Sequence, residues 1–267
     1  TTNRELVGRV FGEEEYREYR VALEFLFKVR TALHLVAKKK QDQLILQFQR
    51  EVALKLGFKD TSTLKAERQL ITKTLSSMRG LYRFTSYYIY RLTRRPYLFD
   101  TFSKGNFTPV IKGIYLHDGE LCASRKLHFG TLEGGLKTLL TLPDEPFKAN
   151  PSLVWALSKV KKKDQSVLKK ITPKLFYRKA LYSLLTLLYE AGVLEEIIPP
   201  FGRVMCLAQF DGYHQYPVDI HSLASLKALE ELQDPFLQGL WESLDLKERA
   251  LLKMALFLHD VGNGRKG

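Results

Sequence analysis

Three long stretches with the hydrophobic periodicity of an α-helix occupy the first hundred residues. They restrict the fold of this 267-residue chain more than any other feature. In residues 14–40, large apolar side chains recur at spacings of three and four and therefore share one helical face. Residues 43–56 repeat the pattern and stop before Gly57, and residues 63–92 form the third stretch. The sequence thus predicts a mainly α fold that begins with a helical bundle.

Residues 107–129 depart from the helical period and predict a small β-hairpin. Two short apolar runs flank the tetrapeptide His117-Asp118-Gly119-Glu120. An Asp-Gly pair between two such runs is typical of a tight hairpin turn. Because Asp favours turns for backbone reasons, we assign His117 and Asp118 to the turn and not to a ligand site.

Residues 143–200 predict further helices and a domain boundary. The lysine-rich residues 143–163 predict a loop with one helix, and a long helix is expected through Leu175–Ala191. Ile197-Ile198-Pro199-Pro200-Phe201 then predicts an extended connection. We place the boundary there, between a helical region over residues 1–200 and a second domain that begins at residue 201.

The last part of the chain predicts two helices that bring histidines together. One helix is expected from Pro217 to Leu232, and Asp245 with Glu248 forms a capping box that opens the other. Helices joined by a short connection are antiparallel neighbours. His221, at the start of the first helix, can therefore lie beside His259 and Asp260, at the end of the second.

These three side chains have the composition of a metal site. Two imidazole nitrogens and one carboxylate suit a divalent cation that activates water. The alternative is that His221 and His259 only pack against or cap their helices, and the spacing alone leaves both interpretations open. The second His-Asp pair, in the hairpin, lacks this helical context.

Charge and aromatic content raise a different possibility, a nucleic-acid site. The net charge is +13, and residues 1–100 carry 20 basic and 11 acidic side chains, whereas residues 201–267 carry 7 and 9. Aromatic side chains alternate with arginines in the third helical stretch, over residues 79–91. Such alternation can bind single strands by stacking, but helix packing with extended arginines explains it better. We therefore expect no nucleic-acid site.

Several features favour a cytoplasmic chain. No apolar run is long enough to span a membrane, and the first residues lack the apolar core of a signal peptide. The two cysteines, Cys122 and Cys206, are far apart and predict neither a disulfide framework nor a zinc-thiolate site. Because the chain does not start with Met, we expect its native N-terminus to lie upstream.

Several segments resemble the bifunctional PII uridylyltransferase/uridylyl-removing enzyme family. Residues 189–199, 209–223 and 256–265 carry the resemblance in the second half of the chain, and Tyr213-His-Gln-Tyr216, Val218-Asp219 and His221 are its most specific part. Residues 25–34 resemble the helical region that follows the nucleotidyltransferase domain of that family. The resemblance spans nearly the whole chain, in the family's order.

The resemblance implies a fold, an activity and a set of site residues. It implies that residues 201–267 form the first part of an α-helical HD domain. In the family, this domain hydrolyses the uridylyl-tyrosine phosphodiester on the PII nitrogen-regulatory protein and releases UMP, with Mn²⁺ or Mg²⁺ as cofactor. His221, His259 and Asp260 match metal ligands, and His259 and Asp260 belong to the catalytic pair. His214 either faces the phosphate, as a third catalytic residue, or only forms a hydrogen bond in its loop.

The resemblance also defines what this chain lacks. A later aspartate ligand would lie beyond Gly267, and the nucleotidyltransferase domain and the glutamine-sensing C-terminal repeats are outside the chain. We therefore expect these 267 residues alone to be nearly inactive. Asn263 stands where the family usually has lysine, so a contact to phosphate is lost or moves to Arg265 or Lys266. The alternative is a non-catalytic interaction module with a vestigial HD site.

Overall fold

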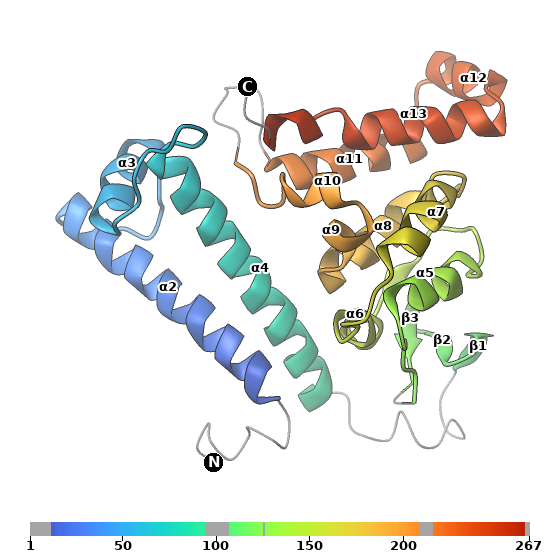
Figure 1. Ribbon diagram of the computed structural model, residues 1–267, viewed down its shortest axis with the longest axis horizontal. Coiled ribbons are helices and arrows are strands. Elements are labelled where there is room, and N and C mark those ends of the chain that lie inside the picture. Colours follow the sequence, from blue (N-terminus) through green and yellow to red (C-terminus); the bar gives the residue numbers. More distant parts are fainter. Residues whose placement is uncertain (1–11, 94–106, 125, 209–215, 265–267) are drawn as a thin grey trace. The chain divides into compact units, whose positions relative to one another are not determined.

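The computed structural model describes residues 12–93, 107–124, 126–208 and 216–264. Within these residues it contains twelve α-helices and one four-stranded mixed sheet (Figure 1). The prediction of a mainly α fold is therefore confirmed. The chain forms two compact units: residues 1–88, 204–219 and 264–267 make unit 1, and residues 89–203 and 220–263 make unit 2. The boundary at residue 200 stays a prediction.

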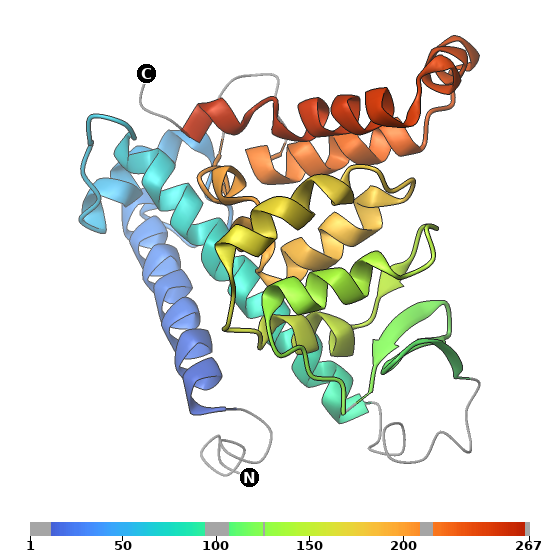
Figure 2. The ribbon, with the colours of Figure 1, turned by 45° about the vertical axis from the view of Figure 1, so that its right-hand side comes forward.

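Unit 1 is built on the three helices expected from the first hundred residues: α2 (Glu13–Ala37), α3 (Leu46–Lys55) and α4 (Ala66–Thr93). Glu15 caps the start of α2 by accepting a hydrogen bond from the Gly12 amide. The helices bury apolar side chains against one another, namely Val29, Ala32, Leu33, Val52, Ala53, Ala66 and Leu70. Helices α2 and α4 lie side by side (Figures 1 and 2), and Tyr19 stacks on Phe84 between them.

Asp60 joins α3 to the start of α4. Its carboxylate accepts hydrogen bonds from the Arg50 guanidinium at 2.9 Å and from the Ala66 amide at 2.8 Å. The bond from Arg50 holds the pKa of Asp60 below its ordinary value, and the Ala66 amide acts in the same direction. One charged side chain thus accepts hydrogen bonds from an arginine on one helix and from an unpaired backbone amide at the start of the next.

Unit 2 contains the predicted hairpin. Strands β2 (Ile114–His117) and β3 (Glu120–Ala123) pair antiparallel, with His117 opposite Glu120. Asp118 and Gly119 have φ of 50° and 75°, which a two-residue hairpin turn requires and which Gly and Asp tolerate. The sheet is larger than expected. Strand β1 (Thr108–Ile111) extends it on one side, and the two-residue β4 (Lys148–Ala149) pairs parallel to β3 on the other.

Six helices follow β3 in unit 2, the first of them before β4, and their bounds differ in part from those expected. They are α5 (Leu132–Leu140), α6 (Pro151–Ser158), α7 (Gln165–Leu175), α8 (Leu181–Ala191), α9 (Leu194–Ile197) and α10 (Pro199–Gly202). The single helix expected within residues 143–163 is α6, and α5 was not predicted.

Two expectations for this region were wrong. The helix expected to run unbroken through Leu175–Ala191 is interrupted at residues 176–180, because side chains from other elements hydrogen-bond the backbone of this turn. The connection expected to be extended at residues 197–201 is instead formed by the ends of two short helices, α9 and α10. Prolines occupy the first positions of α10, where a missing amide hydrogen costs nothing.

The chain ends in α11 (Val218–Glu230), α12 (Pro235–Ser243), α13 (Leu246–Leu258) and a 3₁₀ turn over Val261–Gly264. The capping box of α13 is confirmed, since Asp245 and Glu248 exchange side-chain-to-amide hydrogen bonds of 2.8 Å. The connection between α11 and α13 is longer than expected because it contains α12, which Asp234 caps. Of the helices in the described residues, none is both long and apolar enough to cross a membrane.

Candidate metal centre

Helix α13 carries two of the predicted ligands at its C-terminal end. Phe257 is fully buried and stacks on Phe201 of α10, with ring centroids 4.6 Å apart. His259 is the C-terminal cap of the helix, and Asp260 follows it in the turn. The buried phenylalanine therefore fixes the helix only two residues before the polar pair. A helix C-terminus also carries partial negative charge, which favours a cation nearby.

Helix α11 carries the third ligand in its first turn. The start of this turn is bound to the segment that contains Cys206 and Leu207. The Val218 amide donates to the Leu207 carbonyl, and the buried carboxylate of Asp219 accepts a 2.7 Å hydrogen bond from the Cys206 amide. His221 follows two residues later, and its side chain is one-third exposed.

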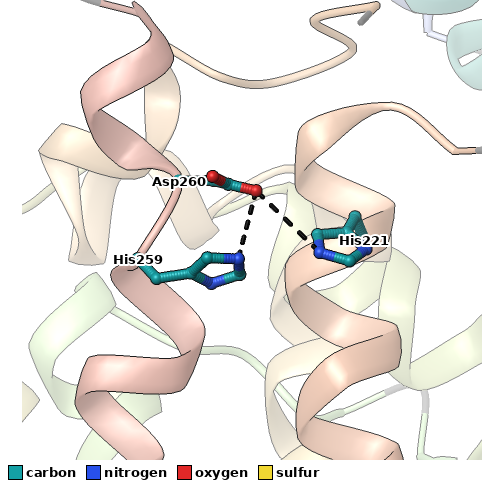
Figure 3. A group of neighbouring side chains, drawn as sticks. All are labelled: His221, His259 and Asp260. Carbon is teal, nitrogen blue, oxygen red and sulfur yellow. Dashed lines mark ion pairs between the residues drawn. The ribbon is translucent and has the colours of Figure 1, made fainter. Parts of the chain in front are cut away.

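The three side chains converge, as the sequence predicted. One ligand atom from each of His221, His259 and Asp260 lies within 4.8 Å of the other two (Figure 3). Oδ2 of Asp260 lies 3.1 Å from Nε2 of His259 and 3.9 Å from Nε2 of His221. The two imidazole rings meet edge to face, with centroids 5.5 Å apart. The carboxylate thus lies between two nitrogens that come from different helices.

One backbone contact fixes which nitrogen of His259 faces the carboxylate. Nδ1 lies 2.7 Å from the Leu256 carbonyl oxygen, and because a carbonyl can only accept, Nδ1 carries the hydrogen. A neutral His259 would then direct the lone pair of Nε2 at the Asp260 carboxylate. Nε2 and the Asp260 oxygen then face each other at 3.1 Å as two acceptors, as two ligand atoms of one cation do.

The group fits a divalent cation. Ligand atoms of one such ion lie about 3–4 Å apart, because each bond is about 2.0–2.2 Å long. The three ligand atoms lie within 4.8 Å of one another, so small side-chain rotations would bring them to this spacing. Asp260 is 18% exposed and His259 is 41% exposed, so one face of the group is open to solvent. Three ligands would leave coordination positions for water and substrate.

His117 and Asp118, which the sequence assigned to a turn, lie apart from this group, as expected. His214 lies outside the described residues. His117 and Asp118 form their own contact of 3.2 Å in the hairpin turn, where His117 also stacks on Phe107. Among the described residues, the His-Asp pair at the end of α13 meets a further histidine, His221.

The chain is similar in sequence to known enzymes. Residues 1–89 match the family model described as GlnD PII-uridylyltransferase. Over 95% of its length, the chain is 27% identical to the bifunctional uridylyltransferase/uridylyl-removing enzyme of Zymomonas mobilis, of which it covers 29%. The enzyme of the same name from Caulobacter vibrioides is 24% identical over 97% of the chain, which covers 30% of that enzyme. The one from Azotobacter vinelandii is 25% identical over 98% of the chain, which covers 31% of it. The chain is homologous to part of these enzymes.

The chain spans about 30% of the length of the curated uridylyltransferase/uridylyl-removing enzymes that it matches. No solved structure matches the chain significantly. The resemblance seen in the sequence is thus confirmed for a region of these enzymes, and the activity of the whole enzymes is not thereby assigned to this chain.

Proposed function

We propose that this chain is the part of a uridylyl-removing enzyme that holds a divalent cation, Mn²⁺ or Mg²⁺, at an HD-type site. The observation that carries the proposal is the convergence of His221, His259 and Asp260 from two helices. In this proposal, residues 201–267 are the start of the HD domain and residues 1–200 the helical region before it. When bound, the cation would lower the pKa of a water molecule and so supply a nucleophile near neutral pH.

The roles of the side chains follow from their contacts. His259 would present Nε2 to the cation, because the Leu256 carbonyl holds its Nδ1 hydrogen. Asp260 would bring the negative charge that offsets the cation, and His221 would fix the cation from the opposite helix. His214, from the same sequence block as His221, is proposed to face the phosphate.

The proposed substrate is the phosphodiester between a uridylyl group and a tyrosine of the PII protein. It is supported by the family name PII-uridylyltransferase and by relatives named uridylyl-removing enzymes. The complete enzyme would also attach uridylyl groups, respond to glutamine through domains outside this chain, and act in the cytoplasm. Hydrolysis would release UMP.

Release of UMP from uridylylated PII tests this function. We expect a chain as long as the curated relatives and containing this region to release UMP only with Mn²⁺ or Mg²⁺. The 267 residues alone should release it at least about tenfold more slowly, because even the loss of groups around a metal site lowers metal affinity or activity about 10–100-fold. His259→Ala should abolish release by the longer chain, and His117→Ala is the matched control. Full activity of the His259→Ala variant would refute the site.

A further inference from the structure

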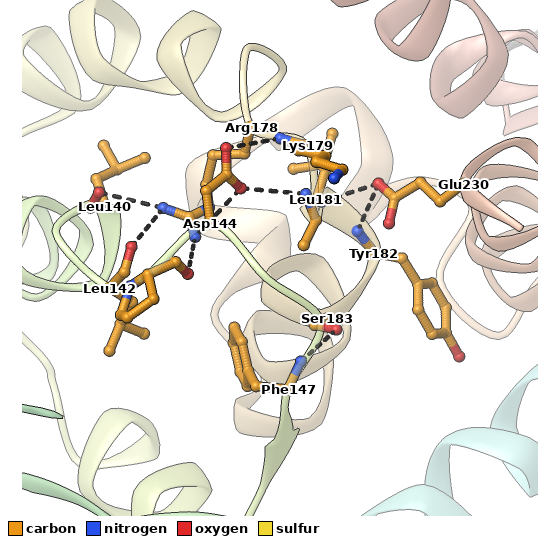
Figure 4. A network of polar contacts seen from close by, with 12 residues as sticks. Leu140, Leu142, Asp144, Phe147, Arg178, Lys179, Leu181, Tyr182, Ser183 and Glu230 are labelled. Carbon is orange, nitrogen blue, oxygen red and sulfur yellow. Dashed lines mark hydrogen bonds and ion pairs between the residues drawn. The ribbon is translucent and has the colours of Figure 1, made fainter.

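The turn between α7 and α8 and the start of α8 bind two carboxylates from elsewhere in the unit, those of Asp144 and Glu230 (Figure 4). Asp144 accepts hydrogen bonds from the amides of Lys179 and Ala180, at 2.8 and 3.1 Å. Glu230, at the end of α11, accepts from the amides of Leu181 and Tyr182, also at 2.8 and 3.1 Å. Residue 180 is an alanine and cannot cap α8 itself. The start of α8 is thus capped by carboxylates from elsewhere in the unit.

Lys253 of α13 completes this cluster from the other side. Its ammonium group donates to the carbonyl oxygens of Arg178 and Lys179 at 2.6 and 2.8 Å and lies 3.5 Å from the Glu230 carboxylate. Its side chain is only 3% exposed. Lys253 therefore ties α13 to the turn before α8 and, through Glu230, to α11. We call this cluster the clamp; it consists of Lys253, Glu230 and residues 178–182.

The charges of the clamp are costly to bury, which limits the explanations for it. Burial raises the pKa of Glu230 and lowers that of Lys253, and in each residue the opposite charge of the partner acts against this effect. A buried ion pair often stabilises a fold no better than well-packed apolar residues would. A hydrogen-bonded pair is directional, however, and the contacts of Lys253 with two carbonyls and a carboxylate restrict where α13 can lie.

The clamp joins the same two helices that carry the proposed metal ligands. Lys253 lies on α13 six residues before His259, and Glu230 lies at the end of α11, whose first turn holds His221. A shift of α13 along α11 by one residue would move His259 by about 1.5 Å. Such a shift is comparable to a metal-ligand bond length, so His259 and His221 could no longer bind the same cation.

We propose that Lys253 and Glu230 are positioning residues that set the register of α13 against α11 and so keep His259 and Asp260 within reach of His221. This inference rests on the proposed metal site for its functional consequence. Its structural part, the register of the two helices, can be measured without metal.

Two readouts on the 267-residue chain test the clamp. The first is Mn²⁺ affinity by electron paramagnetic resonance. We expect Lys253→Met to weaken binding at least about tenfold, because a functional site tolerates displacements of its side chains of only about 0.5 Å. The comparison is made at a temperature where circular dichroism shows the native helix content. Arg249→Met is the matched control. Arg249 is on the same helix but bonds to the carbonyls of Trp241 and Glu242 on α12, so its loss should leave the affinity within about twofold of the wild type.

The second readout is the distance between spin labels on Ala224→Cys of α11 and Ala255→Cys of α13, both exposed positions. The native cysteines are buried and should label slowly. We expect a narrow distance distribution in the parent and the Arg249→Met control, and a broadened or shifted one in Lys253→Met. If Lys253→Met does not fold, the double variant Glu230→Gln/Lys253→Met, which leaves no unpaired charge, replaces it.

The outcomes separate the two proposals. A folded clamp variant with wild-type Mn²⁺ affinity and an unchanged distance distribution would overturn the clamp. Absence of Mn²⁺ binding in the parent chain, with a distribution that still broadens in the clamp variant, would refute the metal site and leave the positioning of the helices supported. If Arg249→Met lost as much Mn²⁺ affinity as Lys253→Met, the loss would reflect the general stability of α13 and would overturn a specific role for Lys253.

Discussion

At the scale of single residues, the Leu256 carbonyl determines the chemistry available to His259. By holding Nδ1 as a donor, it leaves Nε2 as the atom that faces Asp260 and His221. A dipeptide in the sequence does not reveal such a contact, because the carbonyl belongs to the preceding helical turn. The His-Asp pair in the hairpin shows the difference, since its imidazole stacks on Phe107. Local geometry, and not the pair of residue types, distinguishes a candidate ligand.

Asn263 is the basis of a prediction at the same scale. A lysine at this position should raise the rate of phosphodiester hydrolysis by the longer chain, because a positioned cation stabilises negative charge that develops on the phosphate. The comparison is between kcat of the wild type, of Asn263→Lys and of the neutral control Asn263→Gln. If the lysine and glutamine variants have equal kcat, charge at residue 263 plays no part in the reaction.

At the scale of helices and strands, local signals predicted most of what the structure contains. Periodicity gave the three helices of unit 1, Asp245 and Glu248 marked the start of α13, and Asp118-Gly119 marked the hairpin turn. The break before α8 escaped prediction because its cause is distant in sequence: Asp144 and Glu230 bind its amides. The sequence does carry one indication that Lys253 is buried. It lies three residues after Ala250 and four before Phe257, on the same face of the helix, and both of these residues are buried.

Asp60 gives a pH-dependent prediction for the connection between α3 and α4. Because its folded-state pKa is lowered by Arg50, it stabilises the fold above its ordinary pKa of 3.8, and this contribution is lost as the pH falls through the folded value. Asp60→Asn should therefore lower the free energy of unfolding at pH 7, and the difference from wild type should shrink below about pH 4. Urea unfolding across this range measures it. A difference that is constant with pH would show that the charge of Asp60 is not involved.

At the scale of the whole molecule, the excess of positive charge has to be reconciled with a site for a cation. The charge is spread over amphipathic helices, and residues 201–267 carry 7 basic and 9 acidic side chains, so the proposed metal centre lies in the acidic part of the sequence. The homology reaches across both units, since the matched relatives cover at least 95% of the chain. The proximity of His221, His259 and Asp260 could be predicted because the two helices that carry them have clear local signals.

The distribution of charge predicts weak binding of nucleic acids. Binding driven by phosphate contacts falls steeply with salt, and dispersed lysines make few contacts at once. We expect no submicromolar binding of single-stranded RNA or DNA at about 0.15 M salt, where the Debye length is about 8 Å. Fluorescence anisotropy with a labelled oligonucleotide measures this. Submicromolar, salt-sensitive binding would contradict it and would give the aromatic and arginine residues of α4 a stacking role.

Titration of the 267-residue chain with Mn²⁺, followed by electron paramagnetic resonance, tests the central claim most directly. The claim predicts one bound ion per chain, with binding weakened by at least about tenfold in His221→Ala, His259→Ala and Asp260→Ala. Binding should be unchanged in His117→Ala, which removes the imidazole of the other His-Asp pair. Absence of a bound ion, or equal binding by His259→Ala and wild type, would contradict the claim and favour an interaction module in which the group is a remnant.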